Sequence, residues 1–357
     1  MISKVYSQDL SGKNTFRMKV QCRVFIEYDS IADLFELDFE DMLKPIKHIG
    51  GGSNLLFTKD FPGTILHSKV NFIEELREEG DTVLVSAGAG VVFDELCAWT
   101  AKKGLWGPEN LSHIPGEVGA SAVQNIGAYG VEAKDIIRTV CAYDLVEEDF
   151  VRFDVSECGY GYRESMFKSQ ENKDRYIITH VVFAFSRKAD PKLEYGHISE
   201  AVLGRAGGDL SAVTPQMVRE TITEIRRQKL PEPSELGSAG SFFKNPVVSV
   251  DAYQHVVAVA KEMAAKNGTE APVVPHFDVV AEDGAPMVKI PAAWLIDQCG
   301  WKGRRSGNAA VYSKQPLVIV NYTGMAEPEE IVSLESKVIV SVRERFGIVL
   351  SPEVEHI

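Results

Sequence analysis

The feature that most constrains the fold is residues 107–130, a segment that is rich in glycine yet also carries regularly placed apolar residues. A flexible linker would be richer in Ser and Lys and poorer in apolar anchors. The segment therefore predicts an ordered loop that brings backbone close to a ligand, with a purely structural loop packed on a sheet as the alternative. The anchors are Leu111, Ile114, Val118, Val123 and Ile126.

A second glycine-rich segment, 50–54 (GGGSN), follows an expected short strand. Consecutive glycines let backbone N–H groups approach an anion, while Ser53 and Asn54 add side-chain donors. The segment lacks the Gly-Lys-Ser/Thr of a P-loop, and Phe93 stands where a dinucleotide fingerprint starting at Gly88 needs its third glycine. Alone, the turn fits a tight bend equally well, but two such segments in one domain favour an elongated dinucleotide.

Strands alternate with helices over the first ninety residues, which is typical of an α/β domain. Ser30 is a plausible N-cap for a helix, and Gly104 is a plausible stop for another. The expected strands are 20–28, 47–49, 64–70, 82–86, 137–145, 151–153 and 177–185, and the expected helices are 31–43 and 91–103.

A strong helix is expected from Thr214-Pro215, which supply an N-cap and a first-turn proline, to Leu230. The following Pro231-Glu232-Pro233 marks the expected domain boundary. Beyond it, helices at 250–267, 292–299 and 328–346 and strands near Lys289 and at 317–321 predict a smaller α/β domain.

Composition limits the class of protein. The 357 residues suit two or three domains, and 38 basic against 51 acidic residues give a formal charge of −13. This charge disfavours non-specific binding to nucleic acid or anionic membrane. No run approaches the ~20 apolar residues of a membrane-spanning helix, and the N-terminus does not resemble a secretory signal. Five scattered cysteines and eight scattered histidines predict a cytoplasmic protein without a metal site.

Six motifs then identify a family. GGGSNLL, IPGEVGASAVQNIGAYG, GYGYRESMFK, GSFFKNP, AAWLIDQCGWKG and SPEV occur in the order and spacing of UDP-N-acetylenolpyruvoylglucosamine reductases, and the resemblance runs from about Asn14 to Glu353. It implies NADPH-dependent reduction of UDP-N-acetylglucosamine enolpyruvate to UDP-N-acetylmuramate, through non-covalently bound FAD, in peptidoglycan precursor synthesis.

The resemblance also implies an α+β / α/β architecture with an FAD-binding fold of the vanillyl-alcohol oxidase type. Its two subdomains would be residues 1–70 and 71–230, and a C-terminal α/β substrate-binding domain would be 231–357. The residues that it implies for FAD are Ile49, Gly50, Gly51, Gly52, Ser53, Asn54, Leu55, Ile114, Pro115, Gly116, Gly119, Ala120, Ser121, Gln124, Asn125, Gly127, Ile178 and Arg226. Gln124 and Asn125 have the alternative of being buried amides that satisfy loop backbone.

Three residues match the family's catalytic positions. Arg163 would hold the substrate carboxylate, for which its planar fork is suited, although pairing with Glu164 is an alternative. Ser241 would be the proton donor, and Glu353 would assist Arg163 in stabilising the enolate-like intermediate. Without the family pattern, Ser241 is typical of a turn and Glu353 of a solvated tail. The chain ends soon after Glu353, so we expect the strand there to be short or weakly held.

Further residues match positions that contact substrate. Leu193–Gly196 resembles the tyrosine-bearing loop of type I members, and Tyr312 stands where many members have His. Solvated positions near a helix end are an alternative for Arg226 and Lys229. The implied substrate contacts are Tyr162, Tyr195, Lys229, Asn245, Lys289, Lys302 and Gln315.

Two other functions remain open at this point. One is a flavin oxidase of the same fold acting on an alcohol or sugar; such enzymes commonly attach flavin through His or Cys, and His113 is the single such residue in the glycine segments. The other is a non-catalytic binding module for a UDP-sugar or flavin. The expected partners are the UDP-sugar substrate and NADPH, with no nucleic acid or membrane partner, and the protein is expected to be a monomer.

Overall fold

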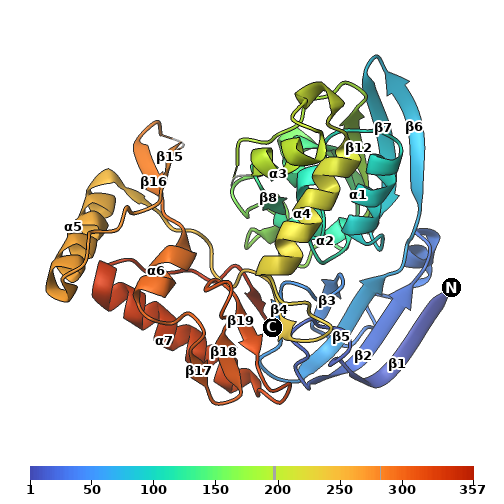
Figure 1. Cartoon of the computed structure of the whole chain (residues 1–357). Helices are drawn as coiled ribbons and strands as arrows, with labels where there is room; N and C mark the ends of the chain where they lie inside the picture. Colours follow the sequence, from blue (N-terminus) through green and yellow to red (C-terminus); the bar gives the residue numbers. More distant parts are fainter. Residues whose placement is uncertain (196–197, 282) are drawn as a thin grey trace. The chain divides into compact units, whose positions relative to one another are not determined.

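The computed structural model describes residues 1–195, 198–281 and 283–357, and the chain divides into two compact units (Figure 1). Unit 1 comprises Met1–Asp9, Gln21–Gly52 and Asp60–Gln228. Unit 2 comprises Leu10–Val20, Ser53–Lys59 and Lys229–Ile357. Two short N-terminal segments therefore belong to the otherwise C-terminal unit, which no composition shift in the sequence indicates.

One sheet of unit 1 has four strands in the order β1–β2–β5–β3. They are β1 (Ile2–Asp9), β2 (Gln21–Tyr28), β5 (Phe61–Ser68) and β3 (Ile46–Ile49). β2 pairs antiparallel with β1 and parallel with β5, and β3 also pairs parallel with β5. The strands predicted at 20–28, 47–49 and 64–70 are confirmed, whereas β1 was not predicted because its side chains are mostly exposed and show no apolar alternation.

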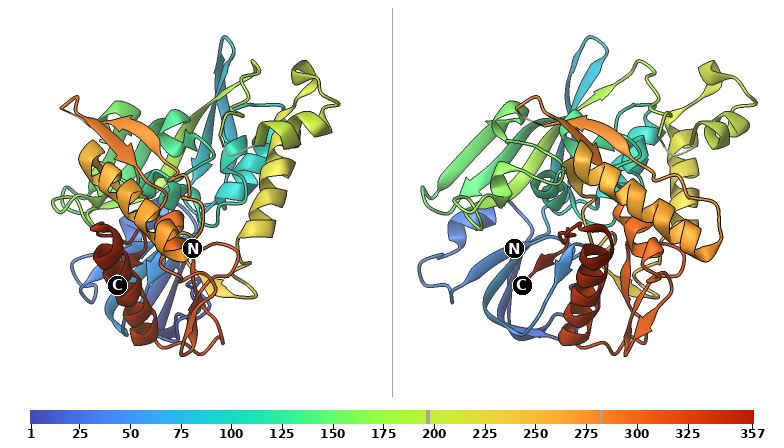
Figure 2. Two further views of the ribbon diagram at one scale, coloured as in Figure 1. Left: turned by 60° about the vertical axis from the view of Figure 1, so that its left-hand side comes forward. Right: turned by 90° about the vertical axis from the view of Figure 1, so that its left-hand side faces the viewer.

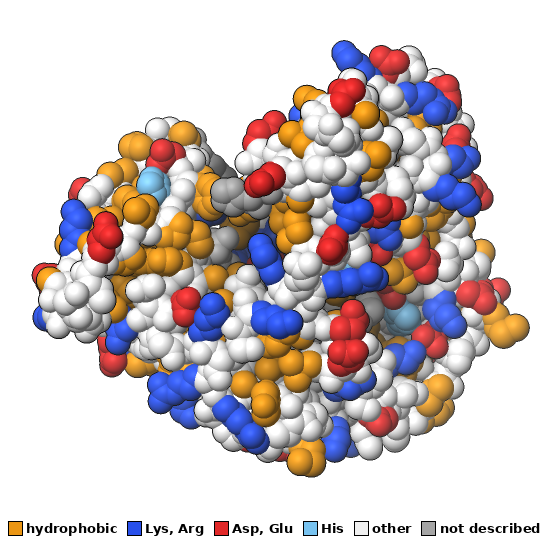
Figure 3. Space-filling model, in the orientation of Figure 1, with side chains coloured by type: hydrophobic (Ala, Val, Ile, Leu, Met, Phe, Trp, Pro, Cys, Tyr) orange, Lys and Arg blue, Asp and Glu red, His pale blue; other side chains and the backbone are white. Residues whose placement is uncertain are grey.

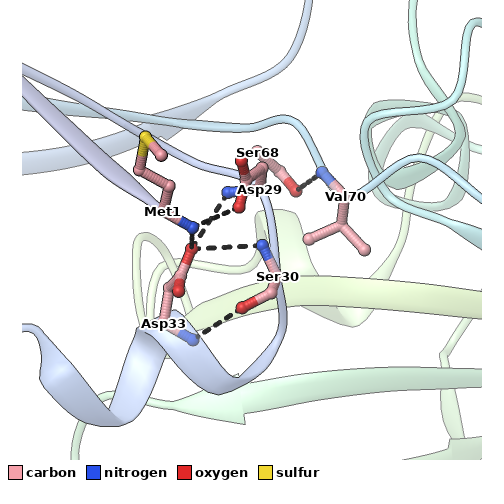
Figure 4. A network of polar contacts seen from close by, with 6 residues as sticks. All are labelled: Met1, Asp29, Ser30, Asp33, Ser68 and Val70. Atoms are coloured by element: carbon pink, nitrogen blue, oxygen red, sulfur yellow. Dashed lines mark hydrogen bonds and ion pairs between the residues drawn. The ribbon is translucent and has the colours of Figure 1, made fainter.

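The start of β1 is tied to the turn after β2 by a polar network (Figure 4). The amino group of Met1 donates to the carboxylates of Asp29 and Asp33, at 2.8 Å to Asp33 Oδ2. The same oxygen accepts the backbone N–H groups of Asp29 and Ser30. The contact with the Met1 amino group, together with these donors, lowers the pKa of Asp33 to about 2.

The other large sheet of unit 1 is antiparallel throughout, in the order β11–β10–β12–β7–β6. Its strands are β11 (Asp149–Asp154), β10 (Ile137–Asp144), β12 (Tyr176–Ser186), β7 (Thr82–Gly88) and β6 (Ile73–Glu79), and β10 and β12 run side by side in Figure 2. β12 alternates buried and less buried residues over most of its length, as its sequence predicts. The edge strand β6 was not predicted, because it is charged and exposed.

Helices complete unit 1. α1 (Phe93–Lys102) ends before Gly104, whose φ of +70° suits glycine at a helix end, as predicted. α2 (Val118–Gln124) contacts β7 and β12, and both helices bury apolar residues in the core beside this sheet. α3 (Ile198–Arg205) and α4 (Pro215–Lys229) pack with Trp106 in a separate cluster. The hydroxyl of Thr214 caps α4 by accepting the N–H of Met217.

Short elements fill the remainder of unit 1. They are the 3₁₀ helices η1 (Ala32–Glu36), η2 (Glu109–Leu111), η3 (Ala133–Asp135), η4 (Val155–Glu157), η5 (Met166–Lys168) and η6 (Leu210–Ala212), and the paired strands β8 (Gly127–Ala128) and β9 (Val131–Glu132).

The helix predicted over 31–43 is wrong, because only η1 forms there. Leu37 turns to an extended conformation, with φ of −84° and ψ of 121°. The carboxylate of Asp38 then accepts the N–H of Asp41, a local contact that competes with helical hydrogen bonding. The buried residues of this stretch are Asp33, Leu34 and Phe39. The apolar Leu34 and Phe39 lie five positions apart, which is not the spacing of a helical apolar stripe.

Unit 2 contains the three predicted helices, α5 (Val250–Asn267), α6 (Ala292–Gln298) and α7 (Pro328–Phe346). α7 has Pro328 in its first turn and a capping box between Glu327 and Glu330, and Gly347 ends it at a φ of +70°. Its buried face follows a helical period: Ile331, Leu334, Val338, Val342 and Phe346. α5 and α7 contact each other, and α5 also packs on β14 and β16.

Three small sheets complete unit 2. Their orders are β13–β19–β18–β17, β14–β16–β15 and β20–β4. The strands are β13 (Gly237–Ser238), β19 (Ile319–Asn321), β18 (Ala309–Val311), β17 (Arg305–Ser306), β14 (Val247–Ser249), β16 (Pro286–Lys289), β15 (Phe277–Val280), β20 (Glu355–His356) and β4 (Leu55–Leu56).

The segment Leu10–Val20 is built into unit 2 by backbone contacts. The side-chain amide of Asn14, almost fully buried, donates to the carbonyls of Leu10 and Met18 and shapes the turn. The carbonyl of Phe16 accepts from the side chain of Asn321, and a Cβ added at Gly237 would lie 2.5 Å from it. Glycine is required at 237 because this backbone approaches so closely.

Apolar side chains are exposed around the β14–β16–β15 sheet of unit 2. Val247, Val250, Val273, Phe277 and Val280 are each 39% to 88% exposed. Figure 3 shows hydrophobic side chains gathered over this part of the unit. The sheet therefore buries few of its own side chains, and its packing depends on α5.

The predicted combination of helices and sheets is present in both units, and no helix among the described residues is long and apolar enough to span a membrane. The expected division at residues 70 and 230 into three domains stays a prediction; the two sheets of unit 1 are compatible with two subdomains.

Candidate functional site

The two glycine-rich segments predicted to approach a ligand lie against each other in unit 1. β3 leads directly into Gly50, and a Cβ added there would lie 3.1 Å from the Cβ of Ala120 and 3.2 Å from Oε2 of Glu117. One added at Gly51 would lie 3.5 Å from Oε1 of Glu117, and Gly52 has a φ of +65°. Glycine at these positions lets the backbone of the turn approach the segment 116–120 closely.

The segment 107–130 is not a loop throughout, because α2 forms within it. Gly119 on α2 approaches β7's continuation so closely that an added Cβ would lie 2.9 Å from the Cβ of Ala89. The hydroxyl of Ser121 is buried and donates to the carbonyl of Val118. Packing thus explains two of the residues expected to contact FAD, as the structural alternative predicts, and their backbone N–H groups donate to the carbonyls of Ala89 and Glu117.

Asn125 ends α2 in the left-handed conformation, with a φ of +45°, and is fully buried. Its side-chain nitrogen donates to Glu132 and to the carbonyl of Gly161, and its oxygen accepts the N–H of Lys134. The Gln124 side chain accepts from Nζ of Lys168 at 3.0 Å. The Asn125 side chain therefore satisfies loop backbone, which was the alternative to direct contact with the flavin.

Arg163 lies beside the end of this segment. Its guanidinium donates to the carbonyls of Asn125 (3.3 Å) and Gly127 (2.7 Å) and lies 5.3 Å from the ring centre of Tyr162. A Cβ added at Gly127 would lie 2.9 Å from Nη1 of Arg163. Gly127 therefore leaves room for the arginine side chain. The two backbone carbonyls orient the guanidinium, and they use only some of its five N–H donors.

Arg226 on α4 is a partly buried cation that contacts the glycine-rich segment. Its Nε donates to the carbonyl of His113, and burial lowers its pKa. Among the residues that the structure describes, no carboxylate pairs with it within ion-pair distance. A partly buried guanidinium with further N–H donors favours an acceptor-rich ligand, so this part of unit 1 fits a bound flavin.

The backbone that Arg226 contacts is itself fixed by an ion pair. Asp94 on α1 accepts the N–H of His113 and forms a bidentate pair with Arg219 on α4, at 2.6 and 2.9 Å. Burial alone would raise the pKa of Asp94, but the Arg219 and His113 donors outweigh it and lower the pKa. This pair holds α1, α4 and the start of the glycine-rich segment in register.

Tyr195, the expected lid residue, packs on the far end of the same segment. Its ring meets the ring of Tyr129 edge-on, with centroids 6.3 Å apart. Its side chain is 41% exposed, and its Cβ would lie 3.6 Å from a Cβ added at Gly130. Gly196 of the LEYG motif lies outside the described residues. Ile178, also expected near the flavin, is buried on β12, and Ile114 packs against the same core.

Ser241 and Glu353 both belong to unit 2, on backbone segments that pair. The N–H of Glu353 donates to the carbonyl of Phe242 at 2.8 Å, Phe243 bridges to Pro352, and the N–H of Lys244 donates to the carbonyl of Ser351. The structure thus brings these two predicted catalytic residues onto adjacent segments, although 112 positions separate them in the sequence (353 − 241). Arg163 belongs to unit 1.

The strand after Glu353 is short, as expected, because β20 has two residues, but it is paired and not weakly held. β20 pairs parallel with β4, and the N–H of Thr58 donates to the carbonyl of Ile357. The side-chain amide of Asn54 donates to the carbonyl of Glu353 at 3.1 Å. Asn54 was expected to contact FAD, and the structure shows its side chain bound to the backbone of a catalytic candidate.

The expected substrate residues after 228 have mixed surroundings within unit 2. Oδ1 of Asn245 accepts the N–H of Ala292 at the start of α6, and the Gln315 side chain accepts the N–H of Leu317. Lys289 on β16 lies 5.7 Å from the ring centre of Phe277, while Lys302 lies 3.9 Å from Asp297. Lys229 ends α4 and is exposed. Asn245 and Gln315 therefore also have structural roles.

The comparisons with known proteins agree with this architecture. Residues 40–149 match the family described as "FAD binding domain", and residues 232–357 match "UDP-N-acetylenolpyruvoylglucosamine reductase, C-terminal domain". A crystal structure of UDP-N-acetylenolpyruvylglucosamine reductase from Thermus caldophilus shares the fold, with a TM-score of 0.63 at 21% identity over 100% of this chain and 98% of that one.

Relatives in sequence are much closer. The UDP-N-acetylenolpyruvoylglucosamine reductase of Bacteroides fragilis is 44% identical over 98% of both chains. That of Porphyromonas gingivalis is 40% identical over 98% of this chain and 97% of its own, and that of Chromobacterium violaceum is 42% identical over 97% and 96%.

The matched FAD-binding domain and the shared fold define the class of this protein as a flavoprotein. The chain belongs to the UDP-N-acetylenolpyruvoylglucosamine reductase family, since relatives of at least 40% identity cover nearly all of it. It is an FAD-containing oxidoreductase, and the flavin oxidase alternative is not favoured.

Proposed function

We propose that this protein uses NADPH to reduce UDP-N-acetylglucosamine enolpyruvate to UDP-N-acetylmuramate, a step of peptidoglycan precursor synthesis. The observation that carries the proposal is that six motifs of the family coincide with full-length similarity to its members. Bound FAD would supply the redox chemistry of this hydride transfer.

Within unit 1, we assign FAD to the glycine turn at 50–52, the segment 114–127, Ile178 and Arg226. Oriented backbone N–H groups at the turn would bind the diphosphate without lysines. The further N–H donors of Arg226 would bind acceptor atoms of the flavin, and its positive charge would tune the electronic properties of the bound cofactor. Ser53, Asn54 and Leu55 continue the same segment into unit 2.

Arg163 would bind the carboxylate of the enolpyruvyl group. When a hydride reaches the terminal vinyl carbon, negative charge develops on the neighbouring carbon and this carboxylate as an enolate. A preorganised cation at that position stabilises the developing charge, and one such contact contributes roughly 3–4 kcal/mol. Glu353 would assist Arg163 in stabilising the same enolate.

Ser241 would complete the reaction by donating its hydroxyl proton to the carbon that bears the ether oxygen. The product then carries one added hydride and one added proton, which balances the loss of two electrons from NADPH. Serine suits this step because an enolate carbon is basic enough to take a proton from a neutral hydroxyl group. A pure binding module would need neither a proton donor at Ser241 nor an acid at Glu353.

Tyr162, Tyr195 and the lysines at 229, 289 and 302 would bind the sugar nucleotide, with Asn245 and Gln315. We expect Tyr195 to close over bound substrate, because mobile loops commonly complete such sites. We further expect the enzyme to act as a monomer in the cytoplasm, which sedimentation of the purified protein and cell fractionation would test.

The decisive experiment is spectroscopic. Purified protein should show flavin absorption that is lost on anaerobic addition of NADPH and recovered on addition of UDP-N-acetylglucosamine enolpyruvate. NADPH should bleach the flavin without UDP-sugar present. Recovery by dioxygen but not by the enolpyruvyl sugar would contradict the proposal and support an oxidase instead.

A further inference from the structure

A histidine in unit 1 bridges two carboxylates next to the glycine turn. Nδ1 of His67 lies 2.9 Å from Oε1 of Glu27, and its Nε2 lies 3.0 Å from Oε1 of Glu117. All three side chains are mostly buried, with 15%, 23% and 13% of the His67, Glu27 and Glu117 side chains exposed. No motif of the family resemblance includes Glu27 or His67, so this cluster was not predicted.

Both contacts of His67 require a donor. A neutral imidazole has one N–H and one lone pair, so it can satisfy only one of two ionised carboxylates. The imidazolium ion donates to both. Burial acts to lower the pKa of His67, but the contacts with Glu117 and then Glu27 outweigh it and raise the pKa. With His67 protonated, the cluster of three groups carries one net negative charge; without that proton, it carries two.

The register of the four-stranded sheet places this cluster at the turn. His67 on β5 lies opposite Glu27 of β2 on one side and opposite Ile49 of β3 on the other, and Ile49 immediately precedes Gly50. The carboxylate of Glu117 then reaches the turn itself, because its oxygens would lie 3.2 and 3.5 Å from Cβ atoms built on Gly50 and Gly51.

Other titratable groups lie on the strands beside His67. His48 on β3 is buried and its pKa is lowered to about 3 by desolvation, so it is neutral, and its Nε2 contacts the hydroxyl of Tyr28 on β2. Burial raises the pKa of Tyr28, so it is neutral as well. Lys47 on β3 forms an ion pair with Asp174. Proton loss from His67 would therefore raise the negative charge beside the turn directly.

We propose that His67 is a positioning residue for the cofactor: it holds Glu117 against the Gly50–Gly51 turn, neutralises it, and links FAD binding to the uptake of a proton. This inference rests on the proposed placement of the FAD diphosphate at that turn. An anionic diphosphate favours the charged imidazolium, so FAD and the proton bind cooperatively. FAD affinity then decreases as the pH rises through the range where His67 of the apoprotein deprotonates.

The test is a titration of apoprotein with FAD between about pH 6 and 9, followed by flavin fluorescence, with calorimetry in buffers of different ionisation enthalpy to count protons. For the wild-type protein we expect the dissociation constant to increase by up to ~10-fold per pH unit, with up to one proton taken up. His67→Gln should bind FAD more weakly at low pH and show no proton uptake. His276→Gln, a change in unit 2 where His276 contacts Tyr253, should behave as wild type.

Glu117→Gln separates charge from packing. The amide keeps the shape of the side chain but removes its charge, so FAD affinity at high pH should increase relative to the wild type. Wild-type binding that is independent of pH and takes up no proton overturns the inference, as does a His67→Gln protein with unchanged proton uptake. These outcomes differ from failure of the proposed function, in which the wild-type protein would not bind FAD at any pH.

Discussion

The glycine-rich site of unit 1 and the Ser241–Glu353 pairing of unit 2 are built in different ways. In unit 1, two stretches of the sequence approach each other because glycines remove the side chains that would separate them. In unit 2, Ser241 and Glu353 lie on segments joined by backbone hydrogen bonds across a large sequence separation, and Asn54 braces the carbonyl of Glu353. The site of unit 1 therefore depends on the absence of side chains at its glycines. The Ser241–Glu353 arrangement of unit 2 depends instead on correct pairing between segments that are far apart in the sequence.

The largest effect should follow from filling the turn of unit 1. Gly51→Val adds a branched side chain beside the Glu117 carboxylate, where the diphosphate would approach. We expect FAD to be lost and activity with it, measured by the flavin absorbance of purified protein. Gly12→Val is the control, since a Cβ at Gly12 would meet no atom within 4 Å. Unchanged flavin content in Gly51→Val would exclude the turn as the diphosphate site.

Ser241→Ala, a change in unit 2, should have the next largest effect, and it should slow only one of the two half-reactions. Flavin reduction by NADPH precedes the need for a proton on carbon, so its rate should stay near that of the wild type. Oxidation of the reduced flavin by the enolpyruvyl sugar should slow by ~10²–10⁴-fold, the usual contribution of a positioned general acid. Stopped-flow measurement of both half-reactions tests this, and an unchanged oxidative rate removes Ser241 from the mechanism. Cysteine at this position should restore part of the rate.

A smaller effect is expected from removing the hydrogen bond between Asn54, in the segment Ser53–Lys59 of unit 2, and the carbonyl of Glu353. Asn54→Ala removes the donor to the Glu353 carbonyl and should cost about 1–3 kcal/mol of stability. If this hydrogen bond orients Glu353, the oxidative half-reaction should slow while flavin content stays constant. Loss of flavin instead would show that Asn54 contacts the cofactor, as the sequence predicts. Thermal unfolding and absorbance distinguish the two results.

The contrast also explains which features the sequence predicted. Both glycine segments, the ends of α4 and α7 and the alternation of β12 are encoded locally, by caps, prolines and side-chain period. Ser241 and Glu353 came from motifs of the family, because neither residue has a local pattern that indicates catalysis. The allocation of Leu10–Val20 and Ser53–Lys59 to unit 2 depends on long-range pairing that no local pattern encodes.

The cluster at His67 was missed for the same reason. Parallel pairing of β2 with β5 and of β5 with β3 brings Glu27 and Ile49 to opposite sides of His67, although the three lie on separate stretches of sequence. One local signal was available: Glu117 is the one acidic residue of 114–127, the part of the glycine-rich segment expected to bind FAD. A carboxylate in that position requires a neutralising partner, and the search for one leads to a histidine or a basic residue.

The smallest predicted effect concerns a second histidine–carboxylate pair, which serves as a comparison for His67. Nε2 of His356 on β20 lies 2.8 Å from Oε2 of Glu335 on α7, and this contact, against the opposing effect of burial, raises the pKa of His356. A raised pKa in the folded state means that the pair stabilises below the pKa of the unfolded chain, about 6.5, and that this contribution is lost as the pH rises through the folded-state value. Because the His356 side chain is 30% exposed, we expect His356→Gln to cost less than about 1 kcal/mol at pH 6 and still less at pH 9. Urea unfolding at both pH values measures this, and FAD affinity should keep its wild-type pH dependence. A change in that dependence would mean that the proton linked to FAD binding is not specific to His67.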